Sequence, residues 1–374
     1  MRVFLLTLGT RGDFELFFSL GCELRRRGHF VLLGSSSFYA ERVTVAGLTW
    51  APMGDGRHED LLALLRSLST VDDKVKRVRQ VADRWLRPQL AAAQAQISKA
   101  GLTSEYFASN LKLMLKRDDS ILPGAFVSYD PPGSIADLAS YGAAGQGGRI
   151  IELVAMSKGL IDPEDRWGSQ FRFTGFWRTE GSGTWTPPDD LVEFVERGDP
   201  PVVMTMGSMV MFSLERLLKA LAEALRISGR RGVVVGGWAA APALANESLM
   251  TVQEADYEWL FPRAACVIHH GGSGTVGAAL RAGRPSVLLP QIPAQEAFAR
   301  LLMQAKLASA CLETHDIAPR ELAIAIDRAA TDPVLNESAR RWREVTQAEG
   351  GVTAAADLIE AHWRQINSSA SAQS

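Results

Sequence analysis

The residues best suited to chemistry lie in one stretch, VIHHGGSGTVGAALRAG at 267–283. A strand-like apolar run leads to His269 and His270, a glycine turn follows, and helix-forming residues begin near Ser273. The first turn of such a helix offers amides without acceptors and the positive end of the helix dipole, which together bind anions. An imidazole beside it would add a second positive source on a diphosphate. The stretch therefore predicts a phosphate or diphosphate site.

Gly272-x-Gly274-x-x-Gly277 also matches the dinucleotide fingerprint. A dinucleotide site needs an acidic residue about 20 residues further on, at the end of the next strand, to bind the ribose. Here that strand, PSVLLPQ, ends at Gln291 and carries no acid. NAD is therefore a minor alternative to another phosphate-containing ligand.

A purely structural interpretation of the histidines is that they alternate across the end of a strand. One of His269 and His270 would then be buried and the other solvated. The glycine turn at a helix start favours the anion role over this interpretation.

The elements that must position this stretch repeat a strand–helix order twice along the chain. Apolar runs at 3–9 and 30–34 flank a helical pattern at 14–27, which is typical of a parallel βαβ unit. Further strands are expected at 48–53, 124–129, 149–155, 201–207, 231–236, 249–254, 266–270 and 285–290. Helices are expected at 58–69, 72–99, 133–142 and 213–228, from Ser273, from Pro293, and three times between 318 and 366. The pattern predicts an α/β protein with two Rossmann-like, doubly wound parallel sheets.

A stretch rich in Gly, Ser, Thr and Pro, RTEGSGTWTPPDD, separates the two halves and is typical of a linker. We therefore expect a first domain over 1–180, a linker over 181–190 and a second domain over 191–360. The C-terminal helix end and tail, 361–374, would pack back on the first domain. Two such domains joined by a hinge imply a cleft between the carboxyl ends of their sheets, where ligands bind.

Composition excludes several classes of partner. The formal net charge of −2 argues against a nucleic-acid partner. Three cysteines without a C-x-x-C pair or zinc spacing indicate a reducing cytoplasm. The N-terminal apolar run is too short for a membrane span, so no stable membrane anchor is expected. The basic and apolar segment 72–85 is read as a surface helix, with an acceptor groove or a lipid contact as alternatives.

Five groups of motifs carry a resemblance to a known family. They are HHGGSGT (269–275), WLFPR (259–263), RAGRPSVLLP (281–290), TLGTRGD (7–13) with LRRRGH (24–29), and TGFW (174–177) with MGSM (206–209). In order and spacing they resemble the nucleotide-sugar glycosyltransferases of the GT-B fold. The likeness is to the group that includes sterol glucosyltransferases and bacterial natural-product glycosyltransferases. Residues 56–120 show no such likeness, and in this family that region shapes the acceptor pocket.

The resemblance implies that the second domain binds a UDP- or dTDP-sugar and the first binds an acceptor. For the diphosphate it implies His270, with His269 as second candidate, and Gly272, Ser273, Gly274, Thr275 and Ser208. For the base and the sugar it implies Trp238, Gln295 and Glu296. The acceptor-side loop would be Thr10, Arg11 and Gly12.

Asp13 is the expected catalytic base. Many relatives carry a histidine in this loop, and here the chain reads Gly12-Asp13. A free aspartate has a pKa of about 3.9 and is a weak base at neutral pH, which suits a reaction in which the proton leaves late. The alternative is that Asp13 only caps a helix that starts at Phe14.

Two sequence features that would help to bind a nucleotide-sugar donor are missing from this chain. The chain has no D-x-D pair of the kind that holds a divalent ion on a diphosphate, so no metal and no cofactor is expected. Relatives have Asp-Gln after the LLP strand, where the aspartate binds sugar hydroxyls; this chain has Ala294-Gln295. We therefore expect a donor sugar that is deoxygenated or altered, or that is bound by other residues such as Glu296.

Together with these observations, the resemblance implies an inverting, metal-independent hexosyltransferase. It would transfer a sugar from a UDP- or dTDP-sugar to a hydroxyl or other nucleophile of a small hydrophobic acceptor, such as an antibiotic-type natural product or a lipid. A nucleotide-sugar epimerase of the same fold is one alternative. A non-catalytic partner protein, supported by Ala294 alone, is the other. Monomer and homodimer both stay open.

Overall fold

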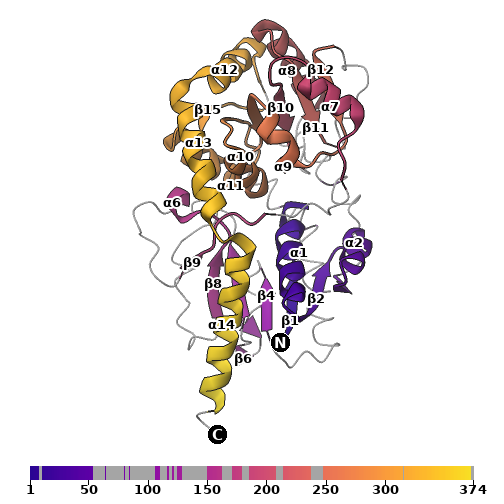
Figure 1. The fold of residues 1–374 in the computed structure, drawn as a ribbon, viewed down its shortest axis with the longest axis vertical. Coiled ribbons are helices and arrows are strands. Elements are labelled where there is room, and N and C mark those ends of the chain that lie inside the picture. The colour runs from indigo at the N-terminus through magenta and orange to yellow at the C-terminus, as the bar shows by residue number, and fades with distance from the viewer. Residues whose placement is uncertain are drawn as a thin grey trace. The chain divides into compact units, whose positions relative to one another are not determined.

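The computed structural model describes residues 1–7, 11–53, 64, 80, 84, 106–109, 116–117, 120–121, 124–128, 150–161, 171–178, 185–207, 214–236, 247–314 and 316–371. The helices expected at 58–69, 72–99 and 133–142 lie outside these residues, apart from the single positions 64, 80 and 84. The chain divides into two compact units (Figure 1). Of the described residues, unit 1 contains those up to 178 and those from 349, and unit 2 contains 185–348.

Unit 1 is built on a parallel sheet with the strand order β3-β2-β1-β4-β7-β8-β9. The strands are β1 (Arg2–Leu6), β2 (Phe30–Ser35), β3 (Thr49–Pro52), β4 (Tyr106–Ser109), β7 (Gly124–Ser128), β8 (Ile150–Val154) and β9 (Phe171–Phe173). A small antiparallel pair joins β5 (Lys116–Arg117) and β6 (Ser120–Ile121). The helical elements are α1 (Arg11–Arg26), η1 (Ser37–Tyr39), α2 (Ala40–Val45), α6 (Lys158–Ile161) and α14 (Gly351–Ser371).

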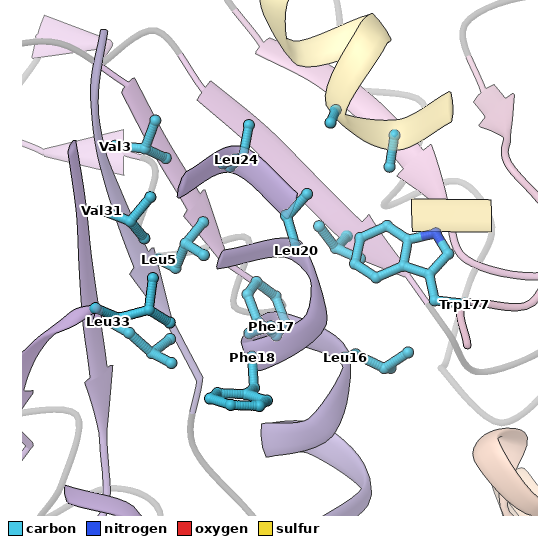
Figure 2. Packing of buried hydrophobic residues seen from close by; sticks show 14 of the residues in the cluster. Val3, Leu5, Leu16, Phe17, Phe18, Leu20, Leu24, Val31, Leu33 and Trp177 are labelled. Carbon is cyan, nitrogen blue, oxygen red and sulfur yellow. The ribbon is translucent and has the colours of Figure 1, made fainter. Parts of the chain in front are cut away.

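The core of unit 1 follows from the helical spacing of α1. Phe17, Leu20 and Leu24 recur every three or four residues and are completely buried. They pack with Leu5 of β1 and Val31 of β2 in one cluster (Figure 2). The apolar stripe of the helix therefore fixes how α1 lies on the sheet and where its first turn points.

Helix α14 brings the end of the chain into the same core. Ala355, Ala356 and Ile359 are completely buried in the cluster that α1 and the sheet form. Arg27, just after α1, donates to Asp357 at 2.6 Å, and His29 is paired with Glu360 at 2.7 Å. Unit 1 thus contains both the first and the last helices of the described chain.

Unit 2 holds a second parallel sheet, in the order β12-β11-β10-β13-β14-β15. Its strands are β10 (Val202–Thr205), β11 (Gly232–Val235), β12 (Leu249–Val252), β13 (Cys266–His269), β14 (Ser286–Leu288) and β15 (Ala308–Cys311). Its helical elements are α7 (Asp189–Glu196), α8 (Leu214–Ser228), α9 (Tyr257–Leu260), η6 (Phe261–Arg263), α10 (Ser273–Ala282), α11 (Pro293–Gln304), α12 (Pro319–Thr331) and α13 (Pro333–Ala348). The strand order reverses between β10 and β13, which is where ligands bind in open sheets of this kind.

The doubly wound architecture predicted from the sequence is confirmed in both units, and the helices expected to begin at Ser273 and Pro293 begin there. The prediction missed β4, β9 and β15, which have three or four residues and no clear periodicity. Within the described ranges, no helix is both long enough and apolar enough to cross a membrane.

Candidate functional site

The predicted anion site lies at the point where the strand order of unit 2 reverses. β10 and β13 are neighbours, with Thr205 opposite His269 in the register. From His269 the chain turns through Gly271, whose φ of +88° favours glycine, and enters α10 at Ser273. Strand, glycine turn and helix start are therefore arranged as the sequence predicted.

The start of α10 leaves backbone donors without acceptors in the helix. Its hydrogen-bond ladder begins with the amide of Val276, which donates to Gly272 O at 2.9 Å. Gly272 is the N-cap residue and provides no side-chain cap, and the first turn carries no acidic side chain. The amides that precede Val276 in this turn are therefore available to an anion.

The predicted residues of this turn differ in accessibility. Gly274 is exposed, Ser273 is half-buried and Thr275 is buried. A Cβ atom built on Gly274 meets nothing within 4 Å, so there is open space beside this residue of the first turn. A ligand that reaches the first turn would therefore meet Gly274 and Ser273 first.

His270 is wedged between two glycines beside this turn. A Cβ on Gly207, after β10, would lie 2.8 Å from the His270 Cε1, and one on Gly272 would lie 2.4 Å from its Nε2. The ring is only 8% exposed, and its Nδ1 is buried without a hydrogen-bond partner. A buried nitrogen of this kind requires an explanation, and a ligand group is one.

Burial also sets the charge of this ring. It lowers the pKa of His270 to about 4, although a hydrogen bond to the backbone of Thr205 acts in the opposite direction. The ring is therefore neutral at pH 7 in the unliganded protein. A neutral ring does not supply the positive charge that the sequence predicts beside the helix start.

His269 is placed quite differently from its neighbour. It is completely buried, and its Nδ1 accepts from the Gly271 amide at 3.1 Å. Because Nδ1 accepts, Nε2 carries the proton of the neutral ring and donates to Ser286 Oγ at 2.9 Å. Burial is the largest cause that lowers the pKa of His269 to about 3, followed by the proximity of His270. Both histidines are buried, so the alternative with one solvated histidine does not describe the structure.

Gln295, which is predicted to bind the sugar of the nucleotide-sugar donor, lies close to this loop. A Cβ on Gly271 would lie 3.0 Å from Gln295 O, in the first turn of α11. Gln295 is 4% exposed, and its Oε1 accepts from the Gln291 amide at 2.7 Å. Its carbonyl oxygen is thus engaged within the protein, and its amino group is the part that could face a ligand. Glu296 follows it in the first turn and is half-buried.

Asp13 lies in the first turn of α1, in unit 1. The helix starts at Arg11 and not at Phe14 as predicted, so Asp13 is the third helical residue and is not the cap. Arg11 and Gly12 are exposed, and Asp13 is half-buried. The carboxylate still lies at the positive end of the helix dipole, which stabilises its charged form.

Charged groups surround the start of α1. Glu15 accepts from Arg42 at 2.7 Å and from Arg11 at 3.1 Å. The buried Tyr39 ring stacks on Phe14 with centroids 3.8 Å apart. Burial raises the pKa of Tyr39, and the nearby carboxylates of Glu15 and then Asp13 add to the effect. Asp13 therefore belongs to a network of ionisable groups.

Three of the predicted site residues, Thr10, Ser208 and Trp238, lie outside the described residues. Two residues now seen in the site, Ser286 and Gly207, lie inside quoted motifs but gave no separate prediction. A serine in a strand and a glycine after one are too common for their partners to be read from sequence. In the part of the chain that is described, no group of three or more His, Cys, Asp or Glu side chains could hold a metal ion.

Comparisons with known proteins agree with this architecture. Residues 3–104 match the glycosyltransferase family 28 N-terminal domain, and residues 247–361 match the C-terminal domain of erythromycin biosynthesis protein CIII-like proteins. O-mycaminosyltylonolide 6-deoxyallosyltransferase of Streptomyces fradiae is 28% identical over 99% of each chain. Sterol 3-beta-glucosyltransferase UGT80B1 of Arabidopsis thaliana is 22% identical over 97% of this chain and 68% of the relative.

Solved structures support the fold. The calicheamicin glycosyltransferase CalG4 superposes with a TM-score of 0.73 at 19% identity, over 96% of this chain and 98% of the other. The spinosyn rhamnosyltransferase SpnG superposes with a TM-score of 0.67 at 19% identity, over 96% and 99%. The two matched domains and the relatives, with a doubly wound sheet in each unit, show that the chain is a glycosyltransferase. It is a nucleotide-sugar glycosyltransferase of the GT-B fold, and it resembles the group of the sterol and antibiotic glycosyltransferases.

Proposed function

We propose that this glycosyltransferase transfers a sugar from a UDP- or dTDP-sugar, with inversion and without a metal, to a small apolar acceptor. The main observation in support of donor binding is the buried Nδ1 of His270, which has no hydrogen-bond partner and lies beside the open first turn of α10. A diphosphate supplies oxygen atoms for both features. The diphosphate is the leaving group and gains negative charge in the transition state. The hydrogen bonds from the His270 ring and from the amides of α10 would then be strongest.

Donor binding would change the charge of His270. The pKa of the unliganded ring is about 4 because the ring is buried. A diphosphate beside Nδ1 would raise this pKa, since an adjacent anion favours the charged ring. Nδ1 would then carry a proton and donate to a phosphate oxygen, so the donor itself would recruit the second positive source.

The donor sugar is proposed to lack a hydroxyl group near α11. Ala294 provides no carboxylate there, and Gln295 has its carbonyl oxygen engaged by the Gln291 amide. A sugar hydroxyl without an acceptor in a buried site costs about 1–3 kcal/mol. The Streptomyces relative is named as a 6-deoxyallosyltransferase, which supports a deoxysugar donor for this chain as well.

The acceptor is proposed to be an antibiotic-type natural product, with a sterol-like lipid as the second class, following the names of the relatives. Its hydroxyl oxygen would attack the anomeric carbon while the bond from that carbon to the diphosphate oxygen breaks. The proton of the hydroxyl would pass to the Asp13 carboxylate. We place this reaction in the cytoplasm, because Cys22, Cys266 and Cys311 are free thiols. No partner besides donor and acceptor is proposed.

A nucleotide-binding screen tests the donor side. The purified protein would be titrated with UDP, dTDP, GDP and NAD while thermal unfolding is followed. A ligand at 100 times its Kd adds about 2.7 kcal/mol to the stability of the folded state. We expect UDP or dTDP to raise the Tm, and His270→Ala to remove most of that shift. A shift by NAD alone would contradict the proposal.

A donor panel completes the test. UDP-glucose would be compared with 6-deoxy and other deoxygenated dTDP-sugars, with and without a set of macrolide and sterol acceptors. We expect turnover only when an acceptor is present, and preference for a deoxygenated donor. Donor turnover in the absence of any acceptor would favour the epimerase alternative. A clear preference for UDP-glucose would contradict the deoxysugar proposal.

A further inference from the structure

We propose that His269 does not touch the donor but positions the loop that does, by holding the Gly271 amide and the Ser286 hydroxyl on opposite sides of its ring. The inference rests on the proposed diphosphate site. It adds to that site a residue that positions the loop without touching the ligand. It assigns adjacent histidines to separate tasks, with His270 facing the ligand and His269 acting through the loop.

Both nitrogens of His269 are already engaged. Nδ1 accepts from the Gly271 amide at 3.1 Å, and Nε2 lies 2.9 Å from Ser286 Oγ. The residue is 0% exposed, so a ligand has no route to either nitrogen without displacing one of these partners. His270, by contrast, keeps one buried nitrogen without a partner.

The position of the Gly271 amide determines the geometry of the whole turn. Gly271 has a φ of +88° and lies between His270 and Gly272, the N-cap residue of α10. Fixing its peptide plane fixes where the His270 ring leaves the chain and where α10 begins. On the other side, a Cβ on Gly271 would lie 3.0 Å from Gln295 O, so the backbone of α11 lies close to the turn. A rotation of this turn would therefore misplace both groups proposed to bind the diphosphate.

Ser286 connects the ring to the sheet. It begins β14, is 3% exposed, and donates its amide to Leu307 O at 2.9 Å. Its neighbour in β13, Val267, is two residues before the ring that it holds. The chain Ser286, His269, Gly271 thus transmits the position of the sheet to the loop. Because the ring is neutral, as its lowered pKa of about 3 requires, Nδ1 stays an acceptor at all pH values at which the enzyme would work.

The sheet offers a matched control. Ser309 of β15 is also a buried strand serine, and its Oγ donates to Ala325 O at 2.8 Å, away from the loop. Ser286→Ala and Ser309→Ala each remove one buried hydroxyl hydrogen bond. We expect the two variants to lose similar stability in thermal unfolding. Only Ser286→Ala should also weaken UDP or dTDP binding, by about 3- to 5-fold, as loss of one hydrogen bond predicts.

Two amide variants separate the nitrogens of His269. Asparagine places its carbonyl oxygen near the position of Nδ1 and can keep the bond to Gly271. Glutamine reaches the position of Nε2 and can keep only the bond to Ser286. We expect His269→Asn to bind the nucleotide about 3- to 5-fold more weakly than the wild type, as Ser286→Ala does, and His269→Gln to bind about 10-fold more weakly. Calorimetric titration with UDP and dTDP measures both, and steady-state kinetics separates KM from kcat.

Three results would decide the matter. If Ser286→Ala and Ser309→Ala bind the nucleotide equally well, His269 is only a core residue and the inference is wrong. If His269→Asn folds normally but binds as weakly as His270→Ala, then His269 contacts the donor and the inference is again wrong. If the wild-type protein binds neither UDP nor dTDP, the proposed function fails first, and this inference fails with it. Where the His269 variants do not fold, the serine pair still decides.

Discussion

The two candidate regions, the histidine loop of unit 2 and the start of α1 in unit 1, are held by different forces. In the loop, glycine backbones enclose the His270 ring, and buried hydrogen bonds fix His269. At the start of α1, Asp13 is half-buried, and Glu15, two residues on, makes ion pairs with two arginines. Packing permits only small displacements, whereas ion pairs near solvent adjust to salt and to ligands. The region proposed to bind the donor is therefore the preorganised one, and the region proposed to face the acceptor is tuned by charge.

The largest effect is expected on kcat, from a substitution at the start of α1. Asp13→Asn keeps the size of the side chain but removes the proposed base, so we expect kcat to fall by about 10²- to 10⁴-fold. The Kd for UDP or dTDP should stay unchanged, because the nucleotide is proposed to bind in unit 2. Near-wild-type kcat with intact substrate binding would show that Asp13 serves only the helix start.

The next largest effect is expected on stability, from substitutions in the closely packed histidine loop of unit 2. Gly272→Ala would place a Cβ at 2.4 Å from His270 Nε2, so we expect a loss of about 1–3 kcal/mol in stability. Gly274→Ala, two residues on, is the control, because its Cβ would meet nothing within 4 Å. There we expect a gain of up to about 1 kcal/mol, since alanine favours the helix. Chemical denaturation without ligand measures both, and equal effects would mean that the loop is not tightly packed.

Acid should weaken unit 2 before unit 1. The histidine pKa values are lowered to about 3 and about 4, so their contribution is complete above pH 6.5 and is lost as the pH falls toward 3. The pKa of Glu23 in α1 is lowered to about 2, mainly by its hydrogen bond with Arg26, so its contribution begins to fall only below about pH 4.5. Thermal scans from pH 7 to pH 3 should lose stability from pH 6.5 downward. In the double variant His269→Asn, His270→Asn that early loss should be reduced.

The smallest effect is expected from one ion pair at α1. Arg42→Ala removes a pair with Glu15 and a cation–π contact with Phe18, whose ring centroid lies 4.6 Å from the guanidinium. We expect a loss of about 1 kcal/mol, reduced by salt. Arg226→Ala, which removes an exposed pair with Glu223, is the control and should change stability by less than about 0.5 kcal/mol. Identical unfolding curves for the two variants would mean that the Arg42 network contributes little.

The same contrast explains what could be predicted from sequence. The glycine turn, the histidines and the start of α10 are local features, and a strand–turn–helix pattern places them without other information. The partner of His269 is not local, since Ser286 lies 17 residues further on in another strand. The sequence predicts the start of α1 three residues late, because Arg11 and Asp13 lack the apolar periodicity that indicates the helix. The engaged carbonyl of Gln295 depends on one backbone turn, and no pattern of residue types predicts it.

The return of the chain to unit 1 at Glu349 has a practical consequence for engineering. The proposed donor site in unit 2 invites the exchange of the C-terminal half between relatives, with a single junction near Thr179. Such a hybrid would also replace α14, and with it Ala355, Ala356 and Ile359, which complete the hydrophobic core of the recipient's N-terminal half. A functional chimaera of this protein should therefore be spliced twice, between Thr179 and Glu180 and again between Ala348 and Glu349, so that each half keeps its own interior.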